Sequence, residues 1–201
     1  MTAGHLAAVL IPFGRLRRVP LWLLLLATQL PDVVWWSLAL LGIEEPTPRS
    51  FIDVTVSGLQ VDMAYSHAVV GVAVTAVFVA IVVASIWRRV DLALWCAGLV
   101  LLHEACDLLS GFEHGLLFGR STEVGFGLYR KSPPFAFALE AAFSALMVAL
   151  YLRGERQQGR DTTRKRKAVL YTFFVASSLI YLPTSYHSMR SLQAGALSGT
   201  P

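Results

Sequence analysis

The chain has 201 residues, of which 55% are hydrophobic and 15% are charged, and its mean hydropathy is +0.58. A soluble domain of this length carries more charge, so the composition indicates an integral membrane protein. The net charge of +4 gives no sign of a nucleic-acid partner, because the basic residues lie in loops between apolar segments.

Five apolar segments have about the 20 residues that a helix needs to cross the hydrocarbon core of a bilayer. They are residues 20–43, 66–87, 90–110, 133–152 and 168–186, and a shorter apolar segment, 4–14, precedes them. The sequence therefore predicts an all-α fold, a polytopic membrane helix bundle of about five transmembrane helices plus a short N-terminal membrane-embedded helix. We expect residues 1–201 to form a single integral membrane domain.

Basic residues predict the orientation of this bundle, because cytoplasmic loops are enriched in Lys and Arg. Of the 17 Lys and Arg residues, twelve lie in one set of loops, at 15–18, 88–89 and 153–167. We expect this set, including the basic loop near the N-terminus, to be cytoplasmic. Loops 44–65 and 111–132 then face outward. The predicted location is the bacterial cytoplasmic (inner) membrane.

Ionisable residues occur within or at the ends of the apolar segments, where they are rare and usually mark a functional site. They are His5, Asp32, His67, His103, Glu104, Asp107 and Glu140. Counted at about 1.5 Å of rise per helical residue, several of them fall at one depth. Asp32, which follows Pro31, could alternatively cap a helix that restarts after the proline.

His103 and Asp107 are four residues apart, so they share one helix face and can reach one ion. Together with His5, Asp32 and His67 they suggest a site for a divalent metal. Imidazole and carboxylate ligands favour zinc, with manganese or iron as further options. A metal also compensates carboxylates that would be costly in hydrocarbon.

The order of four motifs, "GHLAA", "LPD", "DMAYSHAVVG" and "HEACD", resembles the family of bacterial membrane-bound metal-dependent hydrolases. Some members of that family are described as LexA-binding and inner-membrane-associated. The family is distantly similar to zinc-dependent phospholipase C. The resemblance covers residues 3–152, leaving the basic loop and fifth span at 153–201 as an addition. The matching residues are His5, Asp32, His67, His103 and Asp107.

The resemblance implies hydrolysis of a phosphoester or lipid-like substrate by a metal-bound water. Asp62 stands where the family has a second histidine, and we interpret it as a further ligand or the general base. Gly111 and His114 stand where relatives have a histidine and an aspartate. These three departures make a fold without catalysis an alternative.

Other polar residues complete the hypothesis. Glu104 or Glu140 is expected to orient a ligand histidine. Arg120, Arg130 and Lys131 lie in an outward loop against the charge trend, so they are candidates for binding an anionic headgroup. The bilayer itself is the expected partner.

Two further alternatives use the same residues. "HEACD" could be a variant of the His-Glu-x-x-His protease motif, with Glu104 as the general base. A metal or proton transporter would place the same His and Asp residues along a path.

Overall fold

The computed structural model describes residues 2–16, 18–50, 52–119 and 122–198. Within them, five helical segments have the length and apolar composition needed to cross a membrane. They are α3 (Leu21–Leu40), α4 (Val69–Trp87), α5 (Val90–Ser110), α7 (Pro133–Gln157), and α8 (Arg164–Leu179) with the 3₁₀ turn η2 (Leu182–Ser185). This arrangement confirms the predicted all-α bundle and is compatible with a multi-pass membrane protein.

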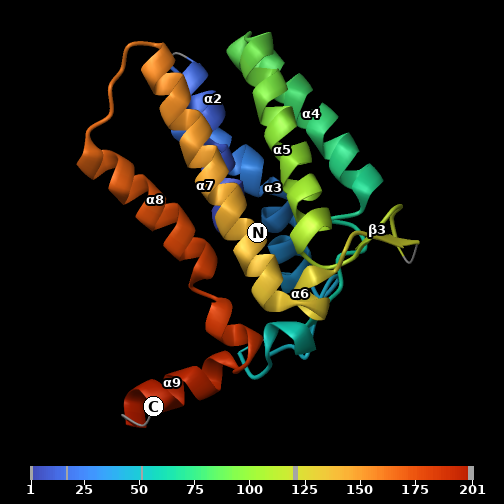
Figure 1. The fold of residues 1–201 in the computed structure, drawn as a ribbon. Coiled ribbons are helices and arrows are strands. Elements are labelled where there is room, and N and C mark those ends of the chain that lie inside the picture. The colour runs from blue at the N-terminus through green and yellow to red at the C-terminus, as the bar shows by residue number, and fades with distance from the viewer. Residues whose placement is uncertain (1, 17, 51, 120–121, 199–201) are drawn as a thin grey trace.

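The N-terminal segment forms two short helices where one was predicted, α1 (Thr2–Ala8) and α2 (Leu10–Arg15). Helix α1 contacts α3, α5, α7 and α8, so it lies inside the bundle. Figure 1 shows α2 beside the C-terminal half of α7. Because the residues at the junction are small and apolar, they pack tightly: Ala7, Ala8 and Val9 are at most 2% exposed.

The helices differ from the predicted segments in continuity and in length. Helix α3 is continuous through Pro31, so the alternative that Asp32 caps a restarted helix is wrong. The predicted basic loop is largely helical, because α7 continues to Gln157 and α8 begins at Arg164. Helix α8 begins where it does because the Thr163 hydroxyl oxygen accepts a hydrogen bond from the backbone N–H of Arg166, at 3.3 Å.

Helices that follow one another in the sequence pack together, and several of them also pack against α1. Helix α5 contacts both α3 and α4, and α7 contacts α8 (Figure 1). The turn between α4 and α5 is short because Arg88 takes a left-handed conformation, with φ of 51°. The apolar core includes Leu24 of α3, Leu92 of α5 and Val148 of α7, all at most 1% exposed.

Loops gather at the opposite end of the bundle from α2, at the bottom and right of Figure 1. They contain two short antiparallel pairs that the sequence did not predict, a 3₁₀ turn and a short helix. The elements are β1 (Pro46–Thr47) with β2 (Gln60–Val61), β3 (His114–Gly115) with β4 (Glu123–Val124), η1 (Val56–Gly58) and α6 (Leu128–Lys131). The C-terminal α9 (Met189–Ser198) lies beyond this end, where Arg190 pairs with Asp53.

Candidate metal centre

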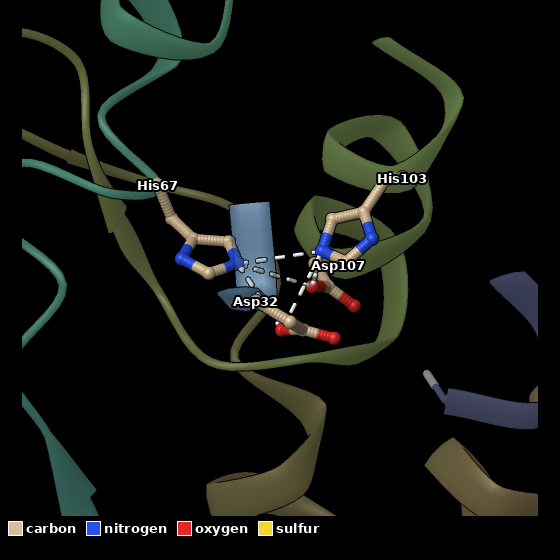
Figure 2. A group of neighbouring side chains, drawn as sticks. All are labelled: Asp32, His67, His103 and Asp107. Carbon is tan, nitrogen blue, oxygen red and sulfur yellow. Dashed lines mark hydrogen bonds and ion pairs between the residues drawn. The ribbon is translucent and has the colours of Figure 1, made fainter. Parts of the chain in front are cut away.

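Four side chains from three parts of the chain meet at the loop end of the bundle (Figure 2). Asp32 comes from the middle of α3, and His103 and Asp107 from successive turns of α5. His67 precedes α4 by two residues, in a turn. Its place just before a helix brings its ring toward α5, which packs against α4.

The ligand atoms of these four residues lie within 4.8 Å of one another. The Nε2 atoms of His67 and His103 are 3.3 Å apart. Oδ1 of Asp32 lies 3.6 Å from Nε2 of His67 and 3.7 Å from Nε2 of His103. Oδ2 of Asp107 lies 3.9 Å and 3.3 Å from the same two nitrogens.

These distances fit a single divalent ion. With bonds of about 2.0–2.2 Å, neighbouring ligand atoms of a four-coordinate zinc are about 3.3–3.5 Å apart. Five separations in the group run from 3.3 to 3.9 Å, so only small shifts separate it from that arrangement. The residues present therefore suit a metal of the zinc class by both donor chemistry and spacing.

Hydrogen bonds hold the two imidazoles with Nε2 toward the group. Nδ1 of His103 lies 2.7 Å from the carbonyl oxygen of Thr28, which can only accept, so Nδ1 carries the proton. Nε2 of His103 is then left with its lone pair, as a metal ligand requires. Nδ1 of His67 lies 2.9 Å from the hydroxyl of Ser66, which orients that ring in the same way.

Burial separates Asp32 from its three companions. The side chains of His67, His103 and Asp107 are at most 11% exposed, whereas that of Asp32 is 34% exposed. Asp32 therefore lies on the open side of the group, where a substrate or solvent can approach.

His5 lies beside the group without joining it. Its Nε2 atom is 3.2 Å from Oδ1 of Asp107, the oxygen that faces away from His103, and its ring stacks on His103 at 3.8 Å between centroids. The carbonyl of His5 accepts a hydrogen bond from the Thr28 hydroxyl at 3.1 Å. His5 thus lies within ion-pair distance of Asp107, with which it was predicted to share the metal.

Glu140 fixes the helix that carries His5. Its Oε1 atom accepts hydrogen bonds from the backbone N–H groups of Ala3 and Gly4, at 3.0 and 3.4 Å, at the start of α1. The hydroxyl of Tyr129 donates to its other oxygen at 3.3 Å. Burial raises the pKa of Tyr129 to about 12, so this hydroxyl keeps its proton at neutral pH.

Glu104 points to His114 and away from the four-residue group. Its Oε1 atom lies 2.8 Å from Nδ1 of His114, and both residues are at most 4% exposed. The His114 ring in turn packs edge-on to His67, with 5.1 Å between centroids. The protease alternative needs a free general base beside the metal ligands, and Glu104 is already paired with a histidine.

Asp62 also lies outside the group. It is exposed, and its carboxylate accepts a hydrogen bond from the backbone N–H of Ala64 at 3.1 Å. Its carbonyl accepts another from the indole N–H of Trp35 at 2.9 Å, which fixes the loop in this position. The structure therefore does not bring Asp62 to the other predicted ligands.

Two of the three predicted headgroup-binding residues, Arg130 and Lys131, are paired with a carboxylate. Glu113 bonds to both Arg130 and Lys131, and its Oε1 atom is 2.7 Å from Nζ of Lys131. Arg120 lies outside the described residues.

Gly111 ends α5 in close contact with the helix. Its N–H donates to the carbonyl of Asp107 at 2.7 Å, and a Cβ at this position would lie 2.8 Å from the same oxygen. A larger residue here would displace the last turn of α5 and with it Asp107.

One cavity adjoins the group on its open side, and a second lies next to the first. A cavity of about 250 Å³ is lined by Asp32, His67 and Asp107 together with apolar and aromatic side chains, among them Trp35, Trp36 and Phe112, and by His114. A larger one of about 690 Å³ is lined by loop residues that include Asp62, Glu113 and Arg130. Both share Leu59, Val61, Met63 and Phe112, so the two spaces are neighbours.

Comparisons of the chain with family models, with curated proteins and with solved structures give no match. The fold and the site therefore define the class by themselves. The chain is an all-α bundle whose helices are apolar enough to cross a membrane, with a His/Asp group suited to a metal ion at one end.

Sequence reasoning missed the residues that hold the ligands. Thr28, Ser66 and Glu44 all make hydrogen bonds around the group. The sequence does indicate Thr28, because it lies four residues before Asp32 in an apolar helix and so shares a helix face with it. No periodic pattern marks Glu44, because it lies in a loop.

Proposed function

We propose that this chain is a membrane-embedded, metal-dependent hydrolase that acts on a phosphoester of a lipid-like substrate. The observation that carries the proposal is the group of Asp32, His67, His103 and Asp107, with ligand atoms within 4.8 Å of one another. Zinc is the proposed metal because imidazole and carboxylate are its ordinary ligands. The likeness of "HEACD" and the other three motifs to bacterial membrane-bound hydrolases supports the same proposal.

A bound metal of this class supplies two things, activation of water at neutral pH and polarisation of the phosphoryl oxygen. The chain's own residues supply the rest. His67 and His103 would hold the ion through Nε2, because Ser66 and Thr28 contact their Nδ1 atoms. The apolar part of the lining of the smaller cavity, with Trp35 and Phe112, favours an apolar substrate group beside Asp32.

His114 is the proposed proton carrier. The Glu104 carboxylate accepts a hydrogen bond from Nδ1–H of His114, which leaves Nε2 as the nitrogen that would exchange a proton with the substrate or leaving group. His114 lines the same cavity as Asp32 and His67, so it lies near where the substrate would bind. This assigns Glu104 a positioning role and places the proton transfer on a residue that the family resemblance had marked as a departure.

Hydrolysis by the zinc-loaded protein in detergent tests the proposal, with a phospholipid in mixed micelles and bis(p-nitrophenyl) phosphate as substrates. We expect His114→Gln to lower kcat by about 100-fold or more, since proton transfer typically contributes that much. Zinc content should be unchanged. The matched control is His187→Gln, at an exposed histidine outside the site. Full zinc occupancy without hydrolysis of either substrate would overturn the hydrolase proposal and leave the metal site in place.

A further inference from the structure

Glu44 is a buried carboxylate that lies in the sequence between two of the proposed ligands, Asp32 and His67. It is 0% exposed, although it lies in the loop after α3. A buried carboxylate is costly unless its oxygens are bonded. The burial of Glu44 therefore indicates a specific structural role.

The Glu44 carboxylate bonds to the backbone just before His67. Its Oε1 atom accepts hydrogen bonds from the N–H groups of Tyr65 and Ser66, at 2.5 and 3.0 Å. Ser66 then contacts Nδ1 of His67 through its hydroxyl at 2.9 Å. Two hydrogen bonds in series, through Ser66, thus join Glu44 to His67, a proposed metal ligand.

The same carboxylate is fixed to the helix that carries Asp32. Helix α3 ends in a turn at Gly42, whose φ is +70°. The backbone N–H groups of Ile43 and Glu44 return to the carbonyl of Leu38, at 2.9 and 3.4 Å. The end of α3 therefore sets the position of Glu44, and Glu44 sets the position of the turn at 65–67.

We propose that Glu44 is a positioning residue that holds His67 at the distance from Asp32 that metal binding requires. The segment around His67 has no helix or sheet of its own, since β2 ends at Val61 and α4 begins at Val69. Three hydrogen bonds from α3 and its terminal turn help to fix it: two accepted by the carboxylate of Glu44, and one donated by the indole of Trp35 to the carbonyl of Asp62. This inference rests on the proposed metal site and adds a residue that touches no ligand atom.

Zinc affinity measured by competition with a chromogenic chelator, on full-length protein in detergent, tests the proposal. Glu44→Asp keeps the charge but shortens the reach, and we expect it to weaken zinc binding by about 10-fold or more, as loss of supporting hydrogen bonds typically does. Glu44→Gln keeps an acceptor oxygen at the same reach, and its affinity should stay within about threefold of wild type on the same reasoning. The matched control is Glu45→Gln, at the neighbouring carboxylate that pairs with Arg49 outside the site.

A second background separates positioning from a general loss of stability. In His67→Ala, the Glu44→Asp change should have no further effect on zinc affinity, because the ligand that it positions is gone. Wild-type affinity in Glu44→Asp, an equal loss in Glu44→Gln, or a further loss in the His67→Ala background would each overturn the proposal. A wild-type protein that binds no zinc would instead remove the metal site on which it rests.

Discussion

Among single residues, the site depends on groups that can only accept a hydrogen bond, both backbone carbonyls and carboxylates. The Thr28 carbonyl can only accept, so it fixes the proton of His103 on Nδ1. Asp107 uses its two oxygens on different partners, Oδ1 toward His5 and Oδ2 toward His103. Contacts within the protein therefore position these ligand atoms without a bound ion.

Glu113 gives a prediction about pH. Its hydrogen bond to Lys131 and the nearby Arg130 hold the pKa of this carboxyl below its usual range. Because the pKa is lowered by folding, the stabilisation is present above the ordinary carboxyl pKa of about 4.3 and is lost as the pH falls through the lowered value. Glu113→Gln should lower the free energy of unfolding by at most about 1 kcal/mol at neutral pH, since both cations are half exposed.

Thermal unfolding of wild type and Glu113→Gln between about pH 3 and pH 7 checks this expectation. The difference between the two midpoints should be constant near neutrality and shrink toward the acid end. A difference that grows in acid would mean that the ion pairs with Arg130 and Lys131 do not carry the stabilisation.

Part of the site could be predicted from these residues alone. The spacing of His103 and Asp107 fixes them on one helix face, and the structure places both in the four-residue group. Asp62 shows the limit of that reasoning. Its position depends on a hydrogen bond from Trp35, 27 residues away, and no local pattern encodes such a contact.

Among the short elements, the turn at 125–131 packs against the side chain of Glu113, and a substitution at Gly127 tests this contact. Gly127 has a φ of +59°, which favours glycine, and a Cβ there would lie 3.0 Å from the Glu113 side chain. Since Arg130 and Lys131 hold that side chain, it cannot move away freely. Gly127→Ala should therefore lower the free energy of unfolding by about 1–2 kcal/mol.

Gly154→Ala is the matched control for that substitution. Gly154 lies inside α7, and a Cβ there would meet nothing within 4 Å. Alanine is favoured over glycine in helices by up to about 1 kcal/mol, so this variant should be as stable as wild type or more so. Circular dichroism during heating in detergent gives the unfolding midpoints of both variants and of wild type. Equal midpoints for Gly127→Ala and wild type would show that the turn does not need glycine.

Long elements were predictable and short ones were not. The five apolar segments predicted helices because each has about the 20 residues that a helix needs to cross the hydrocarbon core of a bilayer. The strands of the loop end have two residues each, too short to show an alternating pattern. The break between α1 and α2 at Val9 was also missed, because an apolar segment continues through it.

At the scale of the whole molecule, the proposed orientation puts the metal site near the outer surface. Loops 44–65 and 111–132, which border the site, are the ones with few basic residues. An impermeant thiol reagent on intact bacterial cells tests this. Thr122→Cys, in the loop end, should react, and Asp161→Cys, in the linker between α7 and α8, should not.

The background of that experiment is low, because the free thiols Cys96 and Cys106 are 0% and 3% exposed. Both engineered positions are exposed, so either reacts once the membrane is opened by detergent. Labelling of Asp161→Cys but not Thr122→Cys in intact cells would reverse the proposed orientation.

Elemental analysis of detergent-purified protein measures whether the group of Asp32, His67, His103 and Asp107 binds a divalent metal. We expect at least about one equivalent of zinc or manganese in wild type, since a single ion suits the four ligands. His103→Ala should lose it, and His187→Ala, at an exposed histidine, should retain it. A metal-free wild type that also fails to take up added zinc would contradict the account.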